Sequence, residues 1–319
     1  MTAATPTRLV ALMRDYARDP SALNVPWVFS PFFDPAVFNS TPALRDLAVR
    51  YRKEGYLVLD EPVVSDQTID QAVADLEGHY TDAQTGYSRP SRRLDAWRFS
   101  RAVADIARAP AVLDTLEALY GRRAFPFQTL SFERGTQQRA HSDTIHFHSV
   151  PQRFMTGVGV ALEDIHPDSG PIVVYPGSHA LPVFDPLDLG FEATWDNHDE
   201  YEDTIAAIAA ARGYQPHALT LKKGQALIWA ANLLHGGAPV ADPAGTRLSQ
   251  ATHYYFEGCF YYQPAVSDPF VGRLALKDVE EVGTGRRVPN LYRGRPVDEW
   301  LGSGGRNGPL RRLFSRGSE

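Results

Sequence analysis

The chain contains the stretch Ala140-His141-Ser142-Asp143-Thr144-Ile145-His146-Phe147-His148, which places three histidines and one aspartate within eight positions. It lies between two segments whose composition predicts β-strands. Alternate side chains of a strand point to the same face, so His141 and Asp143 are predicted to face one way and Ser142 the other. An imidazole and a carboxylate on one face are two of the three protein ligands of an open metal site. The third ligand must come from elsewhere in the chain.

Among the ten histidines of the chain, His235 has the most informative surroundings. It follows an apolar strand predicted at residues 225–230 and is followed directly by Gly236 and Gly237. Glycines at a strand exit leave room for another group to approach the backbone closely. His235 is therefore the predicted third ligand.

Arg247 opens the last strong strand of the sequence, predicted over residues 248–256, and shares a face with Ser249 by the two-residue period. An arginine that points into a barrel is costly to bury unless it meets an anion. Its planar fork of donors suits a carboxylate. Two histidines and one carboxylate with open coordination positions form the ligand set of non-haem Fe(II) oxygenases, and the arginine supplies a partner for the distal carboxylate of a 2-oxo acid.

The composition is that of a globular protein. The chain has 319 residues, 43% of them hydrophobic and 22% charged, with a net charge of −6 that disfavours binding to nucleic acid. The single cysteine, Cys259, excludes an intramolecular disulfide and a cysteine-based zinc site. The sequence shows no secretory signal and no run of about 18 apolar residues, so we expect a cytoplasmic protein without a membrane span.

Helical patterns gather before Gly121, and short strands punctuated by Gly and Pro follow it. The strands are predicted at residues 125–132, 154–162, 172–175, 217–221, 225–230 and 248–256. This order predicts a mainly β sandwich or barrel with helical support. We expect one domain over residues 1–319, with N-terminal support at about 1–121, a β core at about 122–258 and a C-terminal extension at about 259–319.

Three blocks of the sequence resemble the phytanoyl-CoA dioxygenase family of Fe(II)- and 2-oxoglutarate-dependent oxygenases. The blocks are His141-Ser142-Asp143, Gly157-Val158-Gly159-Val160-Ala161-Leu162-Glu163-Asp164, and Asp168-Ser169-Gly170-Pro171-Ile172-Val173-Val174-Tyr175-Pro176-Gly177-Ser178-His179. Gly55-Tyr56-Leu57-Val58-Leu59 resembles the family's N-terminal strand, so that the similarity covers roughly residues 45–258. The resemblance implies a double-stranded β-helix, also called a jelly roll.

The resemblance implies His141, Asp143 and His235 as iron ligands, and Arg247, assisted by Ser249, as the anchor of 2-oxoglutarate. It also implies O2 as the oxidant, with hydroxylation of a small metabolite or natural-product intermediate and release of succinate and CO2. Related halogenases carry Gly or Ala in place of the aspartate, so Asp143 favours hydroxylation or another two-electron oxidation. The sequence departs from many members at Gly237, where they carry a hydroxyl residue.

Further candidates surround these residues in the sequence. One of His146 and His148 is expected near the substrate, with a structural role as the alternative. His253 is in phase with Arg247 and Ser249 and is expected to face the cavity. Gln128 and Gln138 are expected to reach the co-substrate or the substrate.

A loop is predicted at residues 81–98, and its arginines, Arg93 among them, would suit an anionic substrate. A solvated surface loop is the simpler interpretation of the same residues. Residues 195–212 begin acidic and continue as an Ala-rich helix, for which helix capping and a lid over a pocket are the two interpretations.

Two other classes of function stay open at this point. The first is a sensor module that binds metal and oxo acid on the same barrel without turnover. The second is a cupin-like isomerase or hydrolase with another divalent metal, although such an enzyme would not need Arg247.

Overall fold

The computed structural model describes residues 24–36, 41–80, 92–242, 244–292 and 294–297. Residues 5–18, whose pattern predicts a helix, and the end of the C-terminal tail lie outside this part. The α-helices are α2 (Pro42–Glu54), α3 (Asp66–Leu76), α4 (Arg101–Ala107), α5 (Pro110–Tyr120) and α6 (His198–Ala211). No helix of the described part is both long and apolar enough to cross a membrane.

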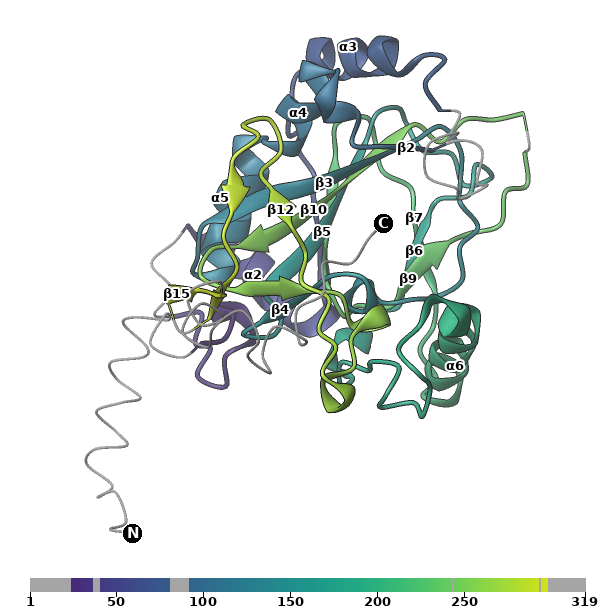
Figure 1. The fold of residues 1–319 in the computed structure, drawn as a ribbon. Helices are drawn as coiled ribbons and strands as arrows, with labels where there is room; N and C mark the ends of the chain where they lie inside the picture. Colours follow the sequence, from purple (N-terminus) through teal and green to yellow (C-terminus); the bar gives the residue numbers. More distant parts are fainter. Residues whose placement is uncertain (1–23, 37–40, 81–91, 243, 293, 298–319) are drawn as a thin grey trace.

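Two antiparallel sheets form the centre of the molecule (Figure 1). The larger sheet has the order β1-β8-β5-β10-β3-β2, and the smaller has the order β7-β6-β9. The strands of the larger sheet are β1 (Tyr56–Leu59), β8 (Ala226–Ala230), β5 (Met155–Ala161), β10 (Ser249–Phe256), β3 (Ala124–Phe132) and β2 (Arg92–Leu94); those of the smaller are β7 (His217–Leu219), β6 (Ile172–Val174) and β9 (His235–Gly237). The predicted double-stranded β-helix with helical support is confirmed.

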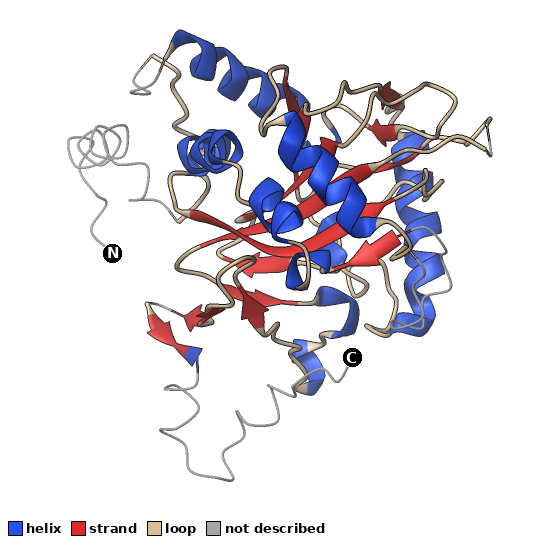
Figure 2. Ribbon diagram, turned by 90° about the horizontal axis from the view of Figure 1, so that it is seen from above, coloured by secondary structure: helices blue, strands red, loops and turns tan. Residues whose placement is uncertain are grey.

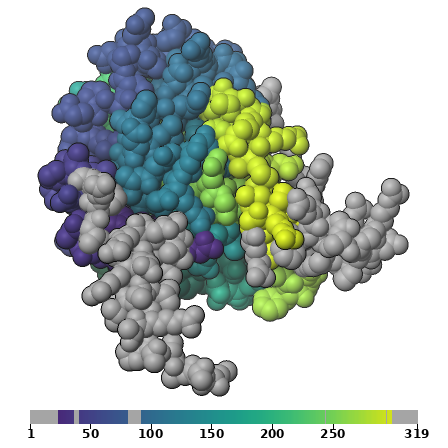
Figure 3. Space-filling model, turned by 90° about the vertical axis from the view of Figure 1, so that its left-hand side faces the viewer, coloured from purple at the N-terminus to yellow at the C-terminus, as the bar shows by residue number. Residues whose placement is uncertain are grey.

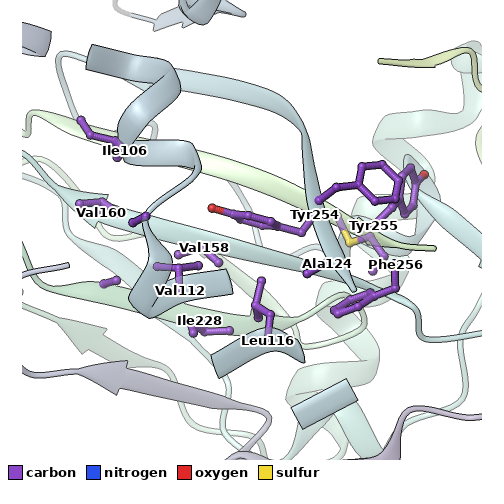
Figure 4. Packing of buried hydrophobic residues seen from close by; sticks show 14 of the residues in the cluster. Ile106, Val112, Leu116, Ala124, Val158, Val160, Ile228, Tyr254, Tyr255 and Phe256 are labelled. Carbon is purple, nitrogen blue, oxygen red and sulfur yellow. The ribbon is translucent and has the colours of Figure 1, made fainter. Parts of the chain in front are cut away.

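The main hydrophobic core lies between the larger sheet and helices α2, α3, α4 and α5, which cover one of its faces (Figure 2). In Figure 4, Leu116 of α5 packs toward Val158 of β5 and Ile228 of β8. Val158 and Val160 face the helices, so Gly157 and Gly159, which alternate with them along β5, face the opposite side of the sheet. That opposite side is the wall of the functional cavity.

Capping side chains and glycines fix where the helices begin and end. Thr41 caps α2 by accepting a hydrogen bond from the Leu44 backbone N–H, and Gly55 ends the helix with a φ of 83°. This left-handed conformation costs glycine little because it has no Cβ. Ser65 caps α3 in the same manner, and Gly121 ends α5.

Two local predictions are wrong. Residues 92–98, predicted as part of a loop, form the edge strand β2 and the 3-10 helix η3 (Ala96–Arg98), because β2 gains pairing with β3. The stretch 140–148 is not one continuous strand: His141 forms an isolated bridge, and Asp143–Ile145 turns as the 3-10 helix η4 before β4 (His148–Val150) begins.

The C-terminal extension adds structure that the sequence did not specify. Its strand β11 (Phe260–Tyr262) pairs with β4, and β12 (Val279–Glu280) pairs with β13 (Arg287–Val288). A last pair, β14 (Leu291–Tyr292) and β15 (Arg295–Pro296), follows. Figure 3 shows this extension in yellow, packed against the helical layer, where Val282 contacts Ala104 and Ala107.

Candidate metal centre

His141, Asp143 and His235 meet between the two sheets. One potential ligand atom from each lies within 4.8 Å of the other two, and all three residues are buried. Within the described part of the chain, this is the one such group of three His, Cys, Asp or Glu residues. The two histidines exchange both backbone hydrogen bonds, at 2.9 and 3.0 Å, so the β-bridge itself places their rings together.

Hydrogen bonds to the backbone orient both imidazoles. His141 Nδ1 lies 3.0 Å from the Arg139 carbonyl oxygen, and His235 Nδ1 lies 3.0 Å from the Leu233 carbonyl oxygen. A carbonyl can only accept, so each Nδ1 carries the proton and each Nε2 keeps its lone pair. The Nε2 atoms lie 3.9 Å (His141) and 3.6 Å (His235) from Asp143 Oδ1. Two imidazole lone pairs and a carboxylate oxygen thus converge on one point, as iron requires.

The electrostatics give the protonation states that a divalent cation needs. Burial lowers the pKa of His235 to about 4, which keeps its imidazole neutral at neutral pH. Burial acts to raise the pKa of Asp143, but His235 and the other adjacent groups outweigh it and lower that pKa to about 2. Side chains bind a metal in their deprotonated form, and His235 and Asp143 are both in that form at neutral pH.

The glycines after His235 allow two backbone segments to approach closely. A Cβ on Gly236 would lie 2.6 Å from the Gln138 carbonyl oxygen, and one on Gly237 would lie 2.7 Å from the Gln137 nitrogen. The room predicted beside His235 therefore serves contact with residues 137–138, which lead into the metal-binding stretch.

A row of paired residues crosses the larger sheet at the level of the metal centre. Trp229, Gly157, His253 and Gln128 pair in sequence across β8, β5, β10 and β3, so all four face the same side. Trp229 donates its indole N–H to Asp143 Oδ2 at 2.8 Å, and His253 Nε2 lies 3.8 Å from the same oxygen. His253 Nδ1 lies 3.0 Å from Gln128 Oε1.

The next rows lead from the metal centre to Arg247. The second row is apolar and consists of Leu227, Gly159, Ala251 and Leu130. In the third row Ser249 pairs with Ala161 and Phe132. Arg247 donates from Nη1 to Ser249 Oγ at 3.0 Å, and its guanidinium lies 5.3 Å from the centroid of the Phe132 ring.

Arg247 retains unused hydrogen-bonding capacity. Its Nε is buried and has no hydrogen-bond partner among the described residues. Burial lowers the pKa of Arg247 to about 10, so the guanidinium stays charged at neutral pH. A buried cation with an unpaired donor fits the distal carboxylate of a 2-oxo acid.

The metal centre and Arg247 line a single cavity of about 1340 Å3 between the two sheets. This exceeds the roughly 300–1,000 Å3 of an ordinary ligand pocket, so the cavity has room for a co-substrate and a substrate together. Its further wall consists of residues from the 3-10 helix η6 (Trp195–Asn197), from α6 and from the C-terminal extension, namely Trp195, His198, Glu202, Gln263, Arg273 and Lys277.

The remaining sequence candidates separate into two groups. His146, Gln138, Gln128 and His253 line the cavity. His146 stacks on Trp195 with ring centroids 5.7 Å apart, and Gln138 donates to Glu202 at 3.4 Å.

Two candidates do not line the cavity. His148 lies in β4 opposite Tyr262 of β11, and the centroids of the two rings are 5.2 Å apart. The η4 turn interrupts the two-residue alternation that would have placed His148 on the same face as His146. Arg93 lies over the Phe99 ring, and its neighbour Arg92 lines the cavity instead. Trp229 and Lys277 also line the cavity and were not predicted from the sequence. For Trp229, the two-residue alternation with Leu227 along the strand was an available signal.

Comparisons with known proteins agree with this geometry. The family model for phytanoyl-CoA dioxygenase matches residues 51–247, which is more than half of the chain. The ectoine dioxygenase of Nocardia farcinica (strain IFM 10152) is 28% identical over 161 residues, covering 47% of this chain and 54% of the relative. The chain therefore matches about half the length of that relative.

Two further comparisons cover more of the chain. The ectoine dioxygenase of Sphingopyxis alaskensis (strain DSM 13593 / LMG 18877 / RB2256) is 26% identical over 239 residues, covering 65% of this chain and 75% of the relative. The crystal structure of the epimerase SnoN in complex with Fe3+, alpha ketoglutarate and nogalamycin RO superposes with a TM-score of 0.56 at 21% identity, covering 83% of this chain and 96% of that one. At this identity the likeness establishes the fold.

Proposed function

The chain belongs to the phytanoyl-CoA dioxygenase family, and from this premise we propose that it is an Fe(II)- and 2-oxoglutarate-dependent dioxygenase that hydroxylates an unactivated C–H bond of a small molecule. In this reaction a C–H bond of the substrate, 2-oxoglutarate and O2 give the alcohol, succinate and CO2. The observation that carries the proposal is the convergence of His141, Asp143 and His235 in one cavity with Arg247.

Each residue has a defined task in this reaction. His141, Asp143 and His235 hold the iron, which when bound supplies the activation of O2 that an unreactive C–H bond requires. Arg247 holds the distal carboxylate of 2-oxoglutarate through its guanidinium, whose Nε has no partner among the described residues, and Ser249 and the Arg134 carbonyl oxygen fix the orientation of that guanidinium.

The walls of the cavity position the co-substrate and exclude water. The apolar row of Leu227, Gly159, Ala251 and Leu130 lies between the level of the metal centre and Arg247, where it suits the methylene chain of 2-oxoglutarate. A dry, shaped cavity favours oxidation of one bound C–H bond over side reactions.

The substrate is a small metabolite or natural-product intermediate. The relatives are named for ectoine, and the superposed structure contains nogalamycin RO. A cavity of about 1340 Å3 accommodates such a molecule beside 2-oxoglutarate. We also propose a cytoplasmic location, with which a chain that has a single cysteine and no intramolecular disulfide is compatible.

Anaerobic titration tests the iron and 2-oxoglutarate assignment. Addition of Fe(II) and 2-oxoglutarate to the purified chain should produce a weak charge-transfer band in the visible region. His141→Ala should abolish the band, whereas His166→Ala should leave it unchanged, because the His166 side chain is 72% exposed and lies outside the cavity.

Turnover is tested separately. The chain is incubated in air with Fe(II), 2-oxoglutarate and each member of a panel of small metabolites, and the release of succinate is measured. The product of any active mixture is then identified by its mass. A wild-type chain that gives no band, or a His141→Ala variant that retains it, would contradict the assignment. A band without succinate release on any substrate would indicate a sensor rather than an enzyme.

A further inference from the structure

One wall of the cavity comes from a part of the chain beyond the family match. The match ends at residue 247, and the C-terminal extension then contributes cavity-lining residues. They are Gln263, Val266, Arg273, Ala275 and Lys277. This wall faces the metal centre and is therefore placed to contact whatever molecule is oxidised there.

The backbone at Lys277 is fixed on both sides. Its N–H donates to the Tyr261 carbonyl oxygen at 2.9 Å, and its own carbonyl oxygen accepts from Asn290 Nδ2 at 2.9 Å. Asn290 Oδ1 also accepts from the Tyr261 N–H at 2.6 Å, so that one amide side chain clamps both segments. Tyr261 belongs to β11, which pairs with β4 directly after the metal-binding stretch. The position of Lys277 is thus set by hydrogen bonds to the β11–β4 pair, and β4 follows the stretch that carries His141 and Asp143.

The Lys277 side chain points over an aromatic ring beside the metal centre. Its Nζ lies 4.6 Å from the centroid of Phe147. The Phe147 ring lies 4.7 Å from that of His253, and His253 contacts Asp143 at 3.8 Å. Two rings therefore separate the ammonium from the iron-binding carboxylate, which is a separation that one small substrate can span.

No described residue gives the Lys277 ammonium a hydrogen bond or an ion pair. The contact with the Phe147 ring offsets only part of the cost of removing the charge from water. Burial lowers the pKa of Lys277 to about 8 against the opposing effect of Asp95, so the ammonium stays mostly charged at neutral pH. In the empty cavity water can solvate it, but a substrate that fills the cavity displaces that water. The ammonium then needs an anion.

The neighbouring charges of the cavity wall each have at least one partner, although the Arg273 Nε, like that of Arg247, has none among the described residues. Glu202 lies 3.5 Å from His198, and Arg273 donates to the Ala193 carbonyl oxygen at 2.9 Å. Arg247 lies over Phe132 on a different element and is assigned to 2-oxoglutarate. Lys277 is therefore free for a second anion.

We propose that Lys277 selects the primary substrate by binding a carboxylate of that substrate through its ammonium group. This proposal rests on the proposed function, because it assigns the substrate class of the same cavity. It adds a specificity-determining residue from the C-terminal extension and predicts a substrate that is an organic acid.

Matched pairs of acids and amides test the proposal. A panel of organic carboxylates, from hexanoate to naphthoate, is titrated beside the corresponding primary amides. Binding is read from tryptophan fluorescence, because Trp195 and Trp229 line the cavity. The titrations are run without oxygen, both with saturating Mn(II) and 2-oxoglutarate and without them, so that a failure of the metal site is seen separately from a failure of acid binding.

In the wild-type chain at pH 7, at least one acid should bind tenfold or more tightly than its amide. Lys277→Met should abolish this preference, and Lys277→Arg should retain it. Lys222→Met is the matched control, since Lys222 is 72% exposed and pairs with Asp164 on the surface. Lys277→Met should keep the visible band of the Fe(II) and 2-oxoglutarate complex, which shows that the fold and metal centre persist.

Three results would overturn the proposal: a wild-type chain that binds no acid of the panel more tightly than its amide, a preference that survives in Lys277→Met, or its equal loss in Lys222→Met. If the visible band is absent while the Lys277-dependent preference is present, the iron function fails and the acid site stands.

Discussion

Trp229 donates its indole N–H to one oxygen of Asp143, Oδ2, at 2.8 Å, while the other oxygen, Oδ1, faces the two histidine Nε2 atoms. Oδ2 therefore makes a structural hydrogen bond, and Oδ1 is the oxygen placed to bind the proposed metal. A hydrogen bond from another residue to a metal ligand fixes the orientation of that ligand, and its loss commonly lowers metal affinity by about 10–100-fold.

Trp229→Phe should weaken metal binding by about 10–100-fold, because Asp143 loses the donor that fixes its orientation. The measurement is a Mn(II) titration, with circular dichroism to verify the fold. Trp97→Phe is the control, since Trp97 packs under the Arg98 guanidinium, and neither residue lines the cavity. Equal metal affinities in wild type and Trp229→Phe would show that the indole does not position the carboxylate.

Gly157 makes room for the same indole. A Cβ at this position would lie 2.2 Å from Trp229 Cε2, whereas a Cβ at Gly159 would lie 3.5 Å from the nearest atom of that ring. Gly157→Ala should therefore displace the indole, cost about 1–3 kcal/mol of stability by overpacking, and weaken Mn(II) binding. Gly159→Ala, two residues along the same strand, should be tolerated. Thermal unfolding and Mn(II) titration of both variants check this, and similar behaviour of the two would refute it.

Arg247→Lys should weaken 2-oxoglutarate binding at least tenfold, about 1.4 kcal/mol, because lysine keeps the charge but loses the planar fork. Mn(II) binding should stay at the wild-type level, since Arg247 contacts none of the three ligands. Ser249→Ala, which removes the acceptor of Arg247 Nη1, should have a smaller effect in the same direction. Anaerobic titration of the visible band of the Fe(II) complex gives the 2-oxoglutarate affinity of both variants, and a separate Mn(II) titration gives their metal affinity. The surface variant Arg101→Lys, whose parent side chain is 92% exposed, is the control.

The preference for an acid over its amide should depend on pH in a manner set by Lys277. Burial lowers the pKa of Lys277 to about 8, so the ammonium is present below that pH and is lost as the pH rises through it. Three titratable groups interact electrostatically with Lys277, namely Asp95, His146 and His253. Burial lowers the pKa of both histidines, so they stay neutral at pH 7 and above. Acid binding should therefore weaken above about pH 8.

The variants separate this effect from other titrations. Lys277→Arg should retain acid binding above pH 8, because guanidinium does not lose its proton there. Lys277→Met should show no such pH dependence. A wild-type preference that stays constant between pH 7 and 10 would contradict the assignment.

Spacing along single strands made much of the centre predictable. The two-residue period places Ser249 and His253 on one face of β10, and both line the cavity. His141, Asp143, His235 and Arg247 were predicted together from their order along the chain and from the family resemblance, although Asp143 lies on η4 and not on a strand.

Contacts between distant segments were not predictable in the same manner. Nothing local to residues 140–148 shows that Asp143–Ile145 turns as a 3-10 helix, which sends His146 to the cavity and His148 to the pair of β4 with β11. Lys277 carries no signal at all, because its place depends on Asn290, thirteen positions further along the chain. The edge strand β2 likewise forms only because β3 is there to pair with it.

The C-terminal extension that carries Lys277 is attached through Glu281. This side chain is 5% exposed and pairs with Arg123 at 2.6 Å and Arg286 at 2.8 Å, which together outweigh burial and lower its pKa. Glu281→Gln should cost about 1–3 kcal/mol at pH 7, whereas Glu280→Gln should cost under about 1 kcal/mol, because its pair with Arg98 is solvent-exposed. A lowered pKa means that the Glu281 contribution is present above about pH 4.5 and is lost as the pH falls below it. Urea unfolding should therefore show a smaller difference in free energy of unfolding between the two variants at pH 4 than at pH 7. An equal difference at both pH values would exclude the ion pairs of Glu281 as its cause.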